Sequence, residues 1–389
     1  MSQIPRDATL DWLACLIAHR SVSSLSNMTL IDDVAAHFHT LGLDVRRTTN
    51  DEGTKANLFA TLPGRAGAYE NGLVLSGHTD VVPVEGQDWA SDPFTMSIRN
   101  GRVHGRGACD MKGFLGVMLG LSQELGEHPP LHPVHFALSF DEELGCLGAP
   151  LMIRDIVAKG YRPRACIVGE PTEMGPVIAH KASRVFECHV RGKACHSSRP
   201  QDGVNAITYA SRIVAFLHTL GDRIRLEEGE DPAFDPPYGT LVVGTIRGGV
   251  ATNSVPEACT LTFTFRTLPP TNAARIEDII RTYITNDILP DMQQEDPTAD
   301  VTLHRRASVP AMQADHCEAV TSMIALLDKT QESCVSYGTE AGLFQEASIP
   351  TLVCGPGSIL QAHRADEYVT LDQLAQCEAW LRKVIARDK

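Results

Sequence analysis

Residues 73–83, LVLSGHTDVVP, show how this chain folds. The first three form an uninterrupted apolar run, which is typical of a short strand that is buried on both faces. The polar residues His78 and Asp80 follow soon after, where the chain should leave the end of the strand. In open α/β sheets, the loops that follow the strands carry the functional side chains. The segment therefore predicts an α/β sheet with a candidate site at a strand end.

Apolar periodicity on both sides of this segment predicts strands that alternate with helices. Two helical patterns come first, and the second ends near Gly42, a residue typical of a helix stop. Strands are then expected at 57–62, 73–76, 134–140 and 165–168, with a helix at 112–125 and another before residue 165. This order is that of an α/β protein.

The pattern changes after about residue 183 and changes back near residue 305. In between, two predicted helices interleave with four short strands, which suits a small α+β sandwich; the helices are at 206–220 and 274–285, and the strands at 184–190, 241–247, 258–266 and 300–304. The closing part returns to the α/β pattern. We therefore predict a catalytic domain made of residues 1–183 and 305–389, interrupted by an inserted α+β domain at 184–304.

The composition is that of a soluble globular protein and excludes several partners. Apolar residues make up 43% of the 389 residues, and no run approaches the roughly 18 apolar residues of a membrane span. The formal net charge of −14 disfavours nucleic acid and anionic membrane as partners. The start of the chain lacks the basic region of a signal peptide, and the eleven cysteines include no Cys-x-x-Cys pair. We therefore expect a cytoplasmic protein with reduced thiols.

Five short motifs carry potential metal ligands, and four of them lie at or just beyond predicted strand ends. They are SGHTDVVP (76–83), GRGACDMKGF (105–114), SFDEELG (139–145), VGEPTE (168–173) and GPGSILQAHRADEYV (355–369). Together they supply histidines and carboxylates, a donor set that suits Zn²⁺ or Co²⁺. A single histidine after a strand is more often an ordinary hydrogen-bonding residue. The joint pattern favours a metal site.

In order and spacing, the five motifs resemble the aminoacylase and glutamate-carboxypeptidase type of co-catalytic zinc hydrolases. The resemblance covers essentially the whole chain, including the inserted domain. It implies a zinc-peptidase-like α/β fold, with a mixed central sheet flanked by helices and an inserted α+β sandwich domain. It also implies two Zn²⁺ ions, which Co²⁺ could replace, and a homodimer, because some relatives dimerise through the inserted domain.

The resemblance assigns a role to each candidate residue of the catalytic domain. Five residues would hold the two metals, with Asp110 as the bridge: His78, Asp110, Glu143, Glu170 and His363. Asp80 would stand behind His78 and fix its tautomer, and the Asp110–Met111 peptide would be cis. Glu142, next to a ligand, would be the general base that takes a proton from the attacking water.

Three residues of the inserted domain complete the implied site. His196, in GKACHSSRP, would stabilise the oxyanion, and in dimeric relatives the equivalent histidine reaches into the partner subunit. Asn253 and Arg266 would contact the oxyanion or the α-carboxylate of the substrate, which a guanidinium can bind through two hydrogen bonds. A polar residue in a serine-rich turn is the alternative for His196, and a buried ion pair is the alternative for Arg266.

Within this family, three segments resemble the acetylornithine deacetylases: SVSSLSNMTLIDDVAAHF (21–38), YGTEAGLF (337–344) and the closing motif. This implies hydrolysis of the amide bond of N-acetyl-L-ornithine to acetate and L-ornithine, a step of arginine biosynthesis, by a zinc-activated hydroxide. Glu340 would bind the free amine. Another amidohydrolase is the alternative, namely a succinyl-diaminopimelate desuccinylase, an aminoacylase or a dipeptidase. A non-catalytic metal-binding scaffold is a more remote one, against which the intact Glu142 argues.

Overall fold

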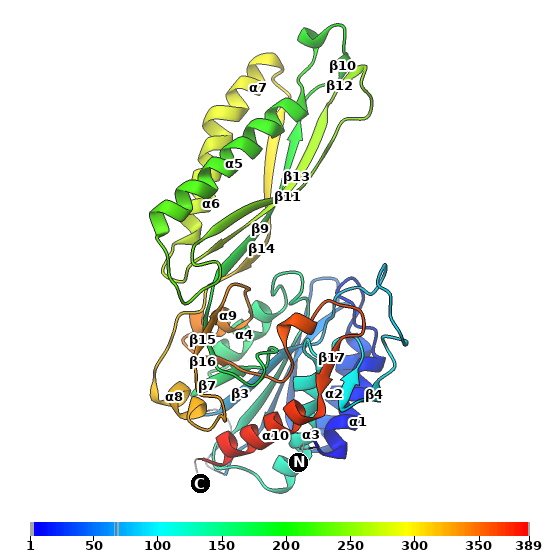
Figure 1. Ribbon diagram of the computed structural model, residues 1–389, viewed down its shortest axis with the longest axis vertical. Coiled ribbons are helices and arrows are strands. Elements are labelled where there is room, and N and C mark those ends of the chain that lie inside the picture. Colours follow the sequence, from blue (N-terminus) through cyan, green and yellow to red (C-terminus); the bar gives the residue numbers. More distant parts are fainter. Residues whose placement is uncertain (1–3, 66, 68–69, 388–389) are drawn as a thin grey trace. The chain divides into compact units, whose positions relative to one another are not determined.

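The computed structural model describes residues 4–65, 67 and 70–387. Contacts within the chain divide it into two compact units (Figure 1). Unit 1 comprises Met1–Ala179, Met312–Cys334 and Thr339–Lys389, and unit 2 comprises His180–Ala311 and Val335–Gly338. Unit 2 is therefore an insertion between two parts of unit 1, with one short addition from later in the chain.

Unit 1 is built on a mixed eight-stranded sheet in the order β1-β2-β6-β3-β7-β16-β8-β15. Strand β3 pairs in parallel with β6 and β7, and β7 pairs in parallel with β16, whereas β1, β2 and β8 pair antiparallel with their neighbours. The strands are β1 Asp44–Thr49, β2 Ala56–Leu62, β3 Leu73–His78, β6 Val134–Ser139, β7 Ala165–Val168, β8 Val177–His180, β15 Ser333–Val335 and β16 Thr351–Val353. A small second sheet contains β4 Ser97–Arg99, β5 Arg102–His104 and β17 Tyr368–Thr370.

Helices pack on both faces of the large sheet, and its central strands are therefore buried along their whole length. Successive residues of a strand point to opposite faces. Leu73 and Leu75 of β3 therefore share one hydrophobic core with helices α1 Asp7–Ala18, α2 Met28–Thr40, α3 Lys112–Glu127, α8 Glu318–Ile324 and α10 Leu371–Ala386. On the opposite face, α4 Ala149–Ala158 packs on β1 and β2, and α9 Ala341–Glu346 packs on β7 and β16.

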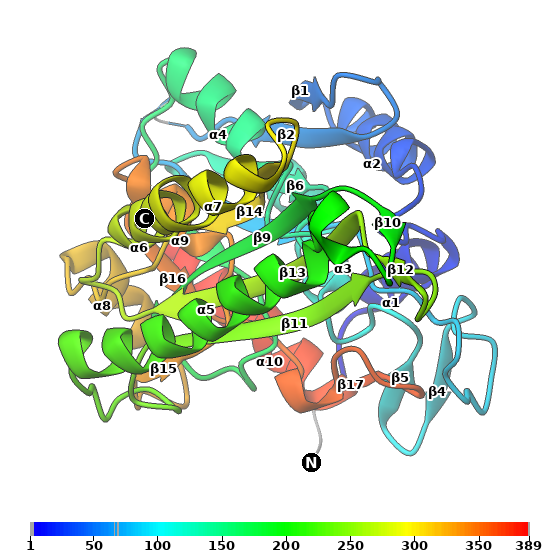
Figure 2. The ribbon, with the colours of Figure 1, turned by 90° about the horizontal axis from the view of Figure 1, so that it is seen from above.

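Unit 2 is a two-layer α+β sandwich. Its antiparallel sheet has the order β11-β13-β9-β14, and α5 and α7 pack on it (Figures 1 and 2). In β13, alternate residues from Cys259 to Phe265 are buried against the helices, and the threonines between them face the other way. The strands are β9 Ala182–Arg191, β11 Thr240–Gly248, β13 Ala258–Thr267 and β14 Asp300–Val309. The helices are α5 Ala206–Glu228, α6 Ala273–Tyr283, a short π-helix Ile284–Ile288 and α7 Leu289–Glu295. Strands β10 Cys195–His196 and β12 Ser254–Val255 form a separate two-stranded ribbon.

The predicted fold class is confirmed, and the observed elements differ from expectation mainly in length. The helix predicted at 206–220 continues to Glu228, and the strand predicted at 300–304 continues to Val309. The strands that were not predicted are mostly short: β1, β4, β5, β8, β10, β12, β15 and β17. For example, β15 is too short and β1 too polar to give an apolar run. None of the described helices is both long and apolar enough to span a lipid bilayer.

Candidate metal centre

The five predicted metal ligands all lie in unit 1 and meet beyond the ends of its parallel strands. His78 is the last residue of β3, and Glu143 and Glu170 follow shortly after β6 and β7. Neighbouring parallel strands end at the same edge of a sheet, so the fold brings these three side chains together. Asp110 precedes α3, and His363 follows the short helix Ile359–Gln361.

The ligand atoms form two groups that share Asp110. His78, Asp110 and Glu170 make one group and Asp110, Glu143 and His363 the other, and within each group the atoms lie within 4.8 Å of one another. Asp110 Oδ1 lies 3.0 Å from His78 Nε2, and Asp110 Oδ2 lies 3.2 Å from His363 Nε2. A carboxylate that presents one oxygen to each group is the arrangement that a bridging ligand requires.

Asp80 connects the histidine of the first group to the loop that follows β6. The main-chain oxygen of Asp80 lies 2.9 Å from His78 Nδ1, closer than its carboxylate oxygen at 3.7 Å. The carboxylate accepts hydrogen bonds from Ser23 Oγ at 2.7 Å and from the main-chain N–H of Glu142 at 3.1 Å. Asp80 therefore orients the imidazole mainly through its backbone and orients the Glu142 loop through its side chain.

Several carboxyl groups lie close together in the centre. Burial, and then the charge of Asp110, raise the pKa of Glu170 to about 8. Burial, followed by the charge of Glu170, raises the pKa of Glu142 well above its usual value, and burial and the charge of Asp110 raise that of Glu143. These pKa values are raised because like charges cannot be held together in a poorly solvated place without a counter-charge.

The two histidines, His78 and His363, are the basic side chains among the five candidate ligands. Hydrogen bonds to Asp110 and Glu143 raise the pKa of His363 to about 10. Burial alone would lower the pKa of His78, but the hydrogen bond to Asp110 and the surrounding carboxylates raise it. Four carboxyl groups face only two imidazoles, so their full ionisation needs further positive charge, and carboxylate oxygen and imidazole nitrogen are donors that Zn²⁺ and Co²⁺ accept. The residues present therefore fit a pair of divalent cations.

The loops that carry the ligands adopt uncommon backbone conformations. The Asp110–Met111 peptide is cis, which confirms the prediction. Asp141 and His363 have positive φ angles of 54° and 63°, in the left-handed region that residues other than glycine seldom adopt. Left-handed residues other than glycine are found at functional sites, where the surrounding structure holds them in place.

Two hydrogen bonds hold Glu142 beside the centre. Its main-chain N–H donates to Asp80, and its Oε1 accepts a hydrogen bond from Cys146 Sγ at 3.4 Å. Burial raises the pKa of the Cys146 thiol well above its usual value, so the thiol keeps its proton and can act as the donor. The next residue in the chain is the candidate ligand Glu143. The predicted general base therefore has a defined position next to the ligands.

A buried ion pair, Arg106–Glu367, joins the two loops that carry Asp110 and His363, and the sequence analysis missed it. Glu367 accepts hydrogen bonds from Arg106 Nη1 at 2.8 Å and from the main-chain N–H groups of Gly107, Cys109 and Asp110 at 2.9–3.0 Å. Arg106 also donates to the main-chain oxygen of Arg364, next to His363. Both residues lie inside the motifs quoted above. A charged residue in such a motif with no role as a ligand was the signal that could have indicated this pair.

The structure brings His196 and Asn253 together but keeps them away from Arg266. His196 pairs with Ser254 in the β10–β12 ribbon, and the N–H of Ser197 donates to the main-chain oxygen of Asn253 at 3.0 Å. Arg266 lies near the other end of the ten-residue strand β13, a distance on the order of 25 Å at the usual rise per residue. Arg266 Nη1 donates to the main-chain oxygen of Ser336 at 3.1 Å rather than to a carboxylate.

Glu340 lies in the interior of unit 1. It is 1% exposed, immediately precedes α9, and its Oε2 accepts a hydrogen bond from Ser76 Oγ at 3.4 Å. Burial raises the pKa of Glu340, an effect that the nearby hydroxyl groups of Ser139 and Ser76 partly offset. Ser76 and Ser139 belong to β3 and β6, the strands that lead to His78 and Glu142. The structure therefore places Glu340 beneath the cluster of predicted ligands.

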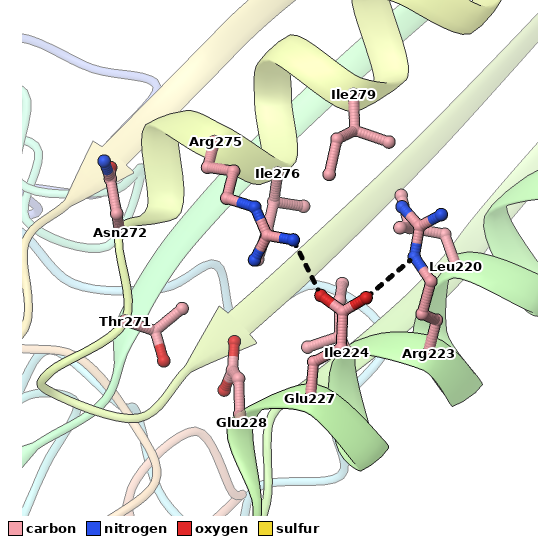
Figure 3. A pocket seen from close by; sticks show the side chains of 10 residues that line it. All are labelled: Leu220, Arg223, Ile224, Glu227, Glu228, Thr271, Asn272, Arg275, Ile276 and Ile279. Carbon is pink, nitrogen blue, oxygen red and sulfur yellow. Dashed lines mark hydrogen bonds and ion pairs between the residues drawn. The ribbon is translucent and has the colours of Figure 1, made fainter.

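A cavity of about 210 Å³ in unit 2 lies between α5 and α6, and none of the predicted site residues lines it. Glu227 forms an ion pair with Arg223 along α5 at 3.5 Å and one with Arg275 of α6 at 2.8 Å (Figure 3). Much of the remaining lining is apolar, from residues such as Ile224 and Ile276. The Glu227 carboxylate is already paired with two cations. We therefore interpret this cavity as a gap between two packed helices and not as a binding site.

Comparisons with known proteins identify the family. The model of peptidase family M20/M25/M40 matches residues 74–387. The acetylornithine deacetylase of Proteus mirabilis (strain HI4320) is 34% identical over 370 residues, which cover 92% of this chain and 90% of that protein. The acetylornithine deacetylase of Pasteurella multocida (strain Pm70) is 32% identical and is covered to 99%, with 100% of this chain.

Solved structures share the fold at low sequence identity. The M20 family metallo-carboxypeptidase Sso-CP2 from Sulfolobus solfataricus superposes with a TM-score of 0.77 at 17% identity, covering 98% of this chain and 99% of that one. The Bacillus subtilis YXEP protein, described as a dinuclear metal-binding peptidase of the M20 family, superposes with a TM-score of 0.66 at 14% identity, covering 98% and 97%. The chain belongs to peptidase family M20/M25/M40, a family of metal-dependent hydrolases.

Proposed function

We propose that this protein hydrolyses N-acetyl-L-ornithine to acetate and L-ornithine with two Zn²⁺ ions, as a step of arginine biosynthesis in the cytoplasm. The observation that carries the proposal is the double group of ligand atoms around Asp110, with Glu142 beside it. The near full-length similarity to acetylornithine deacetylases supports the choice of substrate.

The residues of the centre have different roles in this proposal. His78, Glu170, Asp110, Glu143 and His363 would hold the ions. Two Zn²⁺ ions bound there would polarise the acyl carbonyl and lower the pKa of the attacking water to about 7. Glu142 takes one proton from this water, whose oxygen forms the new bond to the acyl carbon. As the C–N bond breaks, Glu142 delivers that proton to the leaving nitrogen. Its raised pKa suits a group that must both accept and return a proton.

Unit 2 would supply the remaining groups. Arg266 has a guanidinium whose contact in this unit is a carbonyl oxygen, so its charge is available for the α-carboxylate of the substrate. His196 and Asn253 would stabilise the oxyanion. Since Arg266 and His196 of one chain lie too far apart to touch one small substrate, we propose that His196 acts in the centre of a second subunit of a homodimer.

Acetate release tests the proposal directly. We expect the purified protein with Zn²⁺ or Co²⁺ to release acetate from N-acetyl-L-ornithine at a kcat between about 1 and 10³ s⁻¹. A chelator should abolish this activity, and added metal should restore it. Turnover of succinyl-diaminopimelate but not of N-acetyl-L-ornithine would contradict the proposed substrate but not the proposed hydrolase activity. Absence of chelator-sensitive turnover on all acyl-amino acids would contradict the hydrolase itself.

Replacement of Glu340 by glutamine tests recognition of the free amine. If Glu340 binds the ammonium group, the variant should raise KM for N-acetyl-L-ornithine by about 10-fold or more, because a hydrogen bond to a charged group contributes about 1.5–3 kcal/mol. N-acetyl-L-norvaline, which has the same side chain without the amine, is the matched control, and its KM should not change. An equal effect on both substrates would assign Glu340 a structural role.

A further inference from the structure

Three side chains that the metal centre does not use lie together where α1 and α2 meet. They are Cys15 and His19 at the end of α1 and Asp33 in α2, and each offers one potential ligand atom within 4.8 Å of the others. His19 Nε2 lies 3.0 Å from Asp33 Oδ2. The remaining groups of this kind among the described residues are the two that share Asp110.

The local fold directs these side chains to one point. Cys15 and His19 are four residues apart, so they lie one above the other on the same face of α1. His19 is the C-cap of this helix, and Lys112 Nζ donates to its main-chain oxygen at 2.9 Å, which fixes the backbone of the residue. Thr29 Oγ1 lies 3.4 Å from His19 Nδ1. With Nδ1 bonded to Thr29, Nε2 is the nitrogen that faces Asp33.

The chemistry of the group is that of a zinc-type site. We propose that Cys15, His19 and Asp33 bind a thiophilic divalent cation such as Zn²⁺, with water in the fourth position. Thiolate, imidazole and carboxylate are the three ligand types that Zn²⁺ takes in proteins, and Mg²⁺ or Ca²⁺ would not select a cysteine. The Asp33 side chain is 59% exposed and that of His19 19% exposed, so an ion can enter from solvent.

Binding would also reinforce the chain next to the metal centre. The segment that follows His19 lies against the SGHTD motif: Ser21 Oγ donates to the main-chain oxygen of Thr79 at 2.6 Å, and Ser23 Oγ donates to Asp80 Oδ2 at 2.7 Å. An ion that holds the end of α1 to α2 would restrain the start of this segment. We therefore expect the site to stabilise the folded chain without taking part in the reaction.

Cobalt spectroscopy distinguishes this site from the metal centre, because none of the five proposed ligands there is a cysteine. We expect Co²⁺ added to the metal-free protein to produce the near-ultraviolet charge-transfer band of a cobalt–thiolate bond. The band should be lost in Cys15→Ser and weakened in His19→Gln and Asp33→Asn. It should remain in Cys317→Ser, a half-buried thiol outside the group, and in Asp110→Asn, which disrupts the centre.

A second measurement covers variants that fold poorly. Zn²⁺ should raise the Tm of the Asp110→Asn protein. In the double variant Asp110→Asn/Asp33→Asn, in which the exposed ligand Asp33 is also replaced, most of that increase should be lost. No thiolate band in the wild-type protein, or a band that survives in Cys15→Ser, would overturn the proposal. The outcome is independent of acetate release, so failure here and failure of the proposed activity are separate results.

Discussion

Replacing Glu142 by glutamine should lower kcat for N-acetyl-L-ornithine by about 10²–10⁴-fold, the usual contribution of a general acid–base group. The amide has nearly the same shape as the carboxylate but cannot accept a proton from water. Since Glu142 is not among the five proposed ligands, the variant should still bind two metal ions. Stopped-assay acetate release and metal content of the dialysed protein are the two measurements.

The matched control is Glu346→Gln, an exposed glutamate at the end of α9 that should leave kcat unchanged. Loss of both metal ions in Glu142→Gln would mean that this residue holds the centre together rather than acting as the base. Retention of most of the activity with both ions bound would remove Glu142 from the mechanism.

Replacing Glu367 by alanine should lower the free energy of unfolding of the metal-free protein by about 3–5 kcal/mol, because it leaves the Arg106 cation buried and unpaired. Arg106 and Glu367 are each 1% exposed, so the cation would lose its partner in a poorly solvated place. Three main-chain N–H groups next to Asp110 would also lose their acceptor. Denaturant unfolding in the presence of a chelator measures the effect.

Metal affinity then separates a positioning role of Glu367 from a purely structural one. We expect the variant to bind Co²⁺ more weakly even under conditions where it is fully folded, because the loops of Asp110 and His363 are no longer joined. The control is Asp155→Asn, which breaks the partly exposed Arg46–Asp155 pair and should cost about 1 kcal/mol or less. A folded Glu367→Ala protein with wild-type Co²⁺ affinity would show that the pair only stabilises the fold.

Much of unit 1 could be predicted from the sequence because its signals are local. The central strands are short apolar runs, and residues such as His78 and Glu170 interrupt or follow these runs at once. A buried parallel strand is largely apolar, so a polar residue that follows an apolar run indicates the end of the strand. Unit 2 was predictable for a similar reason, since the alternation in β13 is a local pattern.

Contacts between distant segments could not be predicted in this way. Arg106 and Glu367 are 261 residues apart in the chain, and Cys15, His19 and Asp33 come from two different helices. Nothing in the residues near Arg106 indicates which carboxylate will neutralise it. Strand β15 contains only Ser333–Val335, and its place at the edge of the large sheet follows from pairing rather than from its own composition.

The sequence by itself therefore determined the fold class and predicted an inserted domain and a set of candidate metal ligands, because burial imposes apolar periodicity and the motifs interrupt it. Only the tertiary structure decided how these residues meet. It gave Asp110 an oxygen for each group of ligands, placed Glu340 beneath them, and separated His196 from Arg266 by nearly the length of β13. The physical reason is that chain order sets which side chains are available, whereas strand pairing and helix packing set the distances on which chemistry depends.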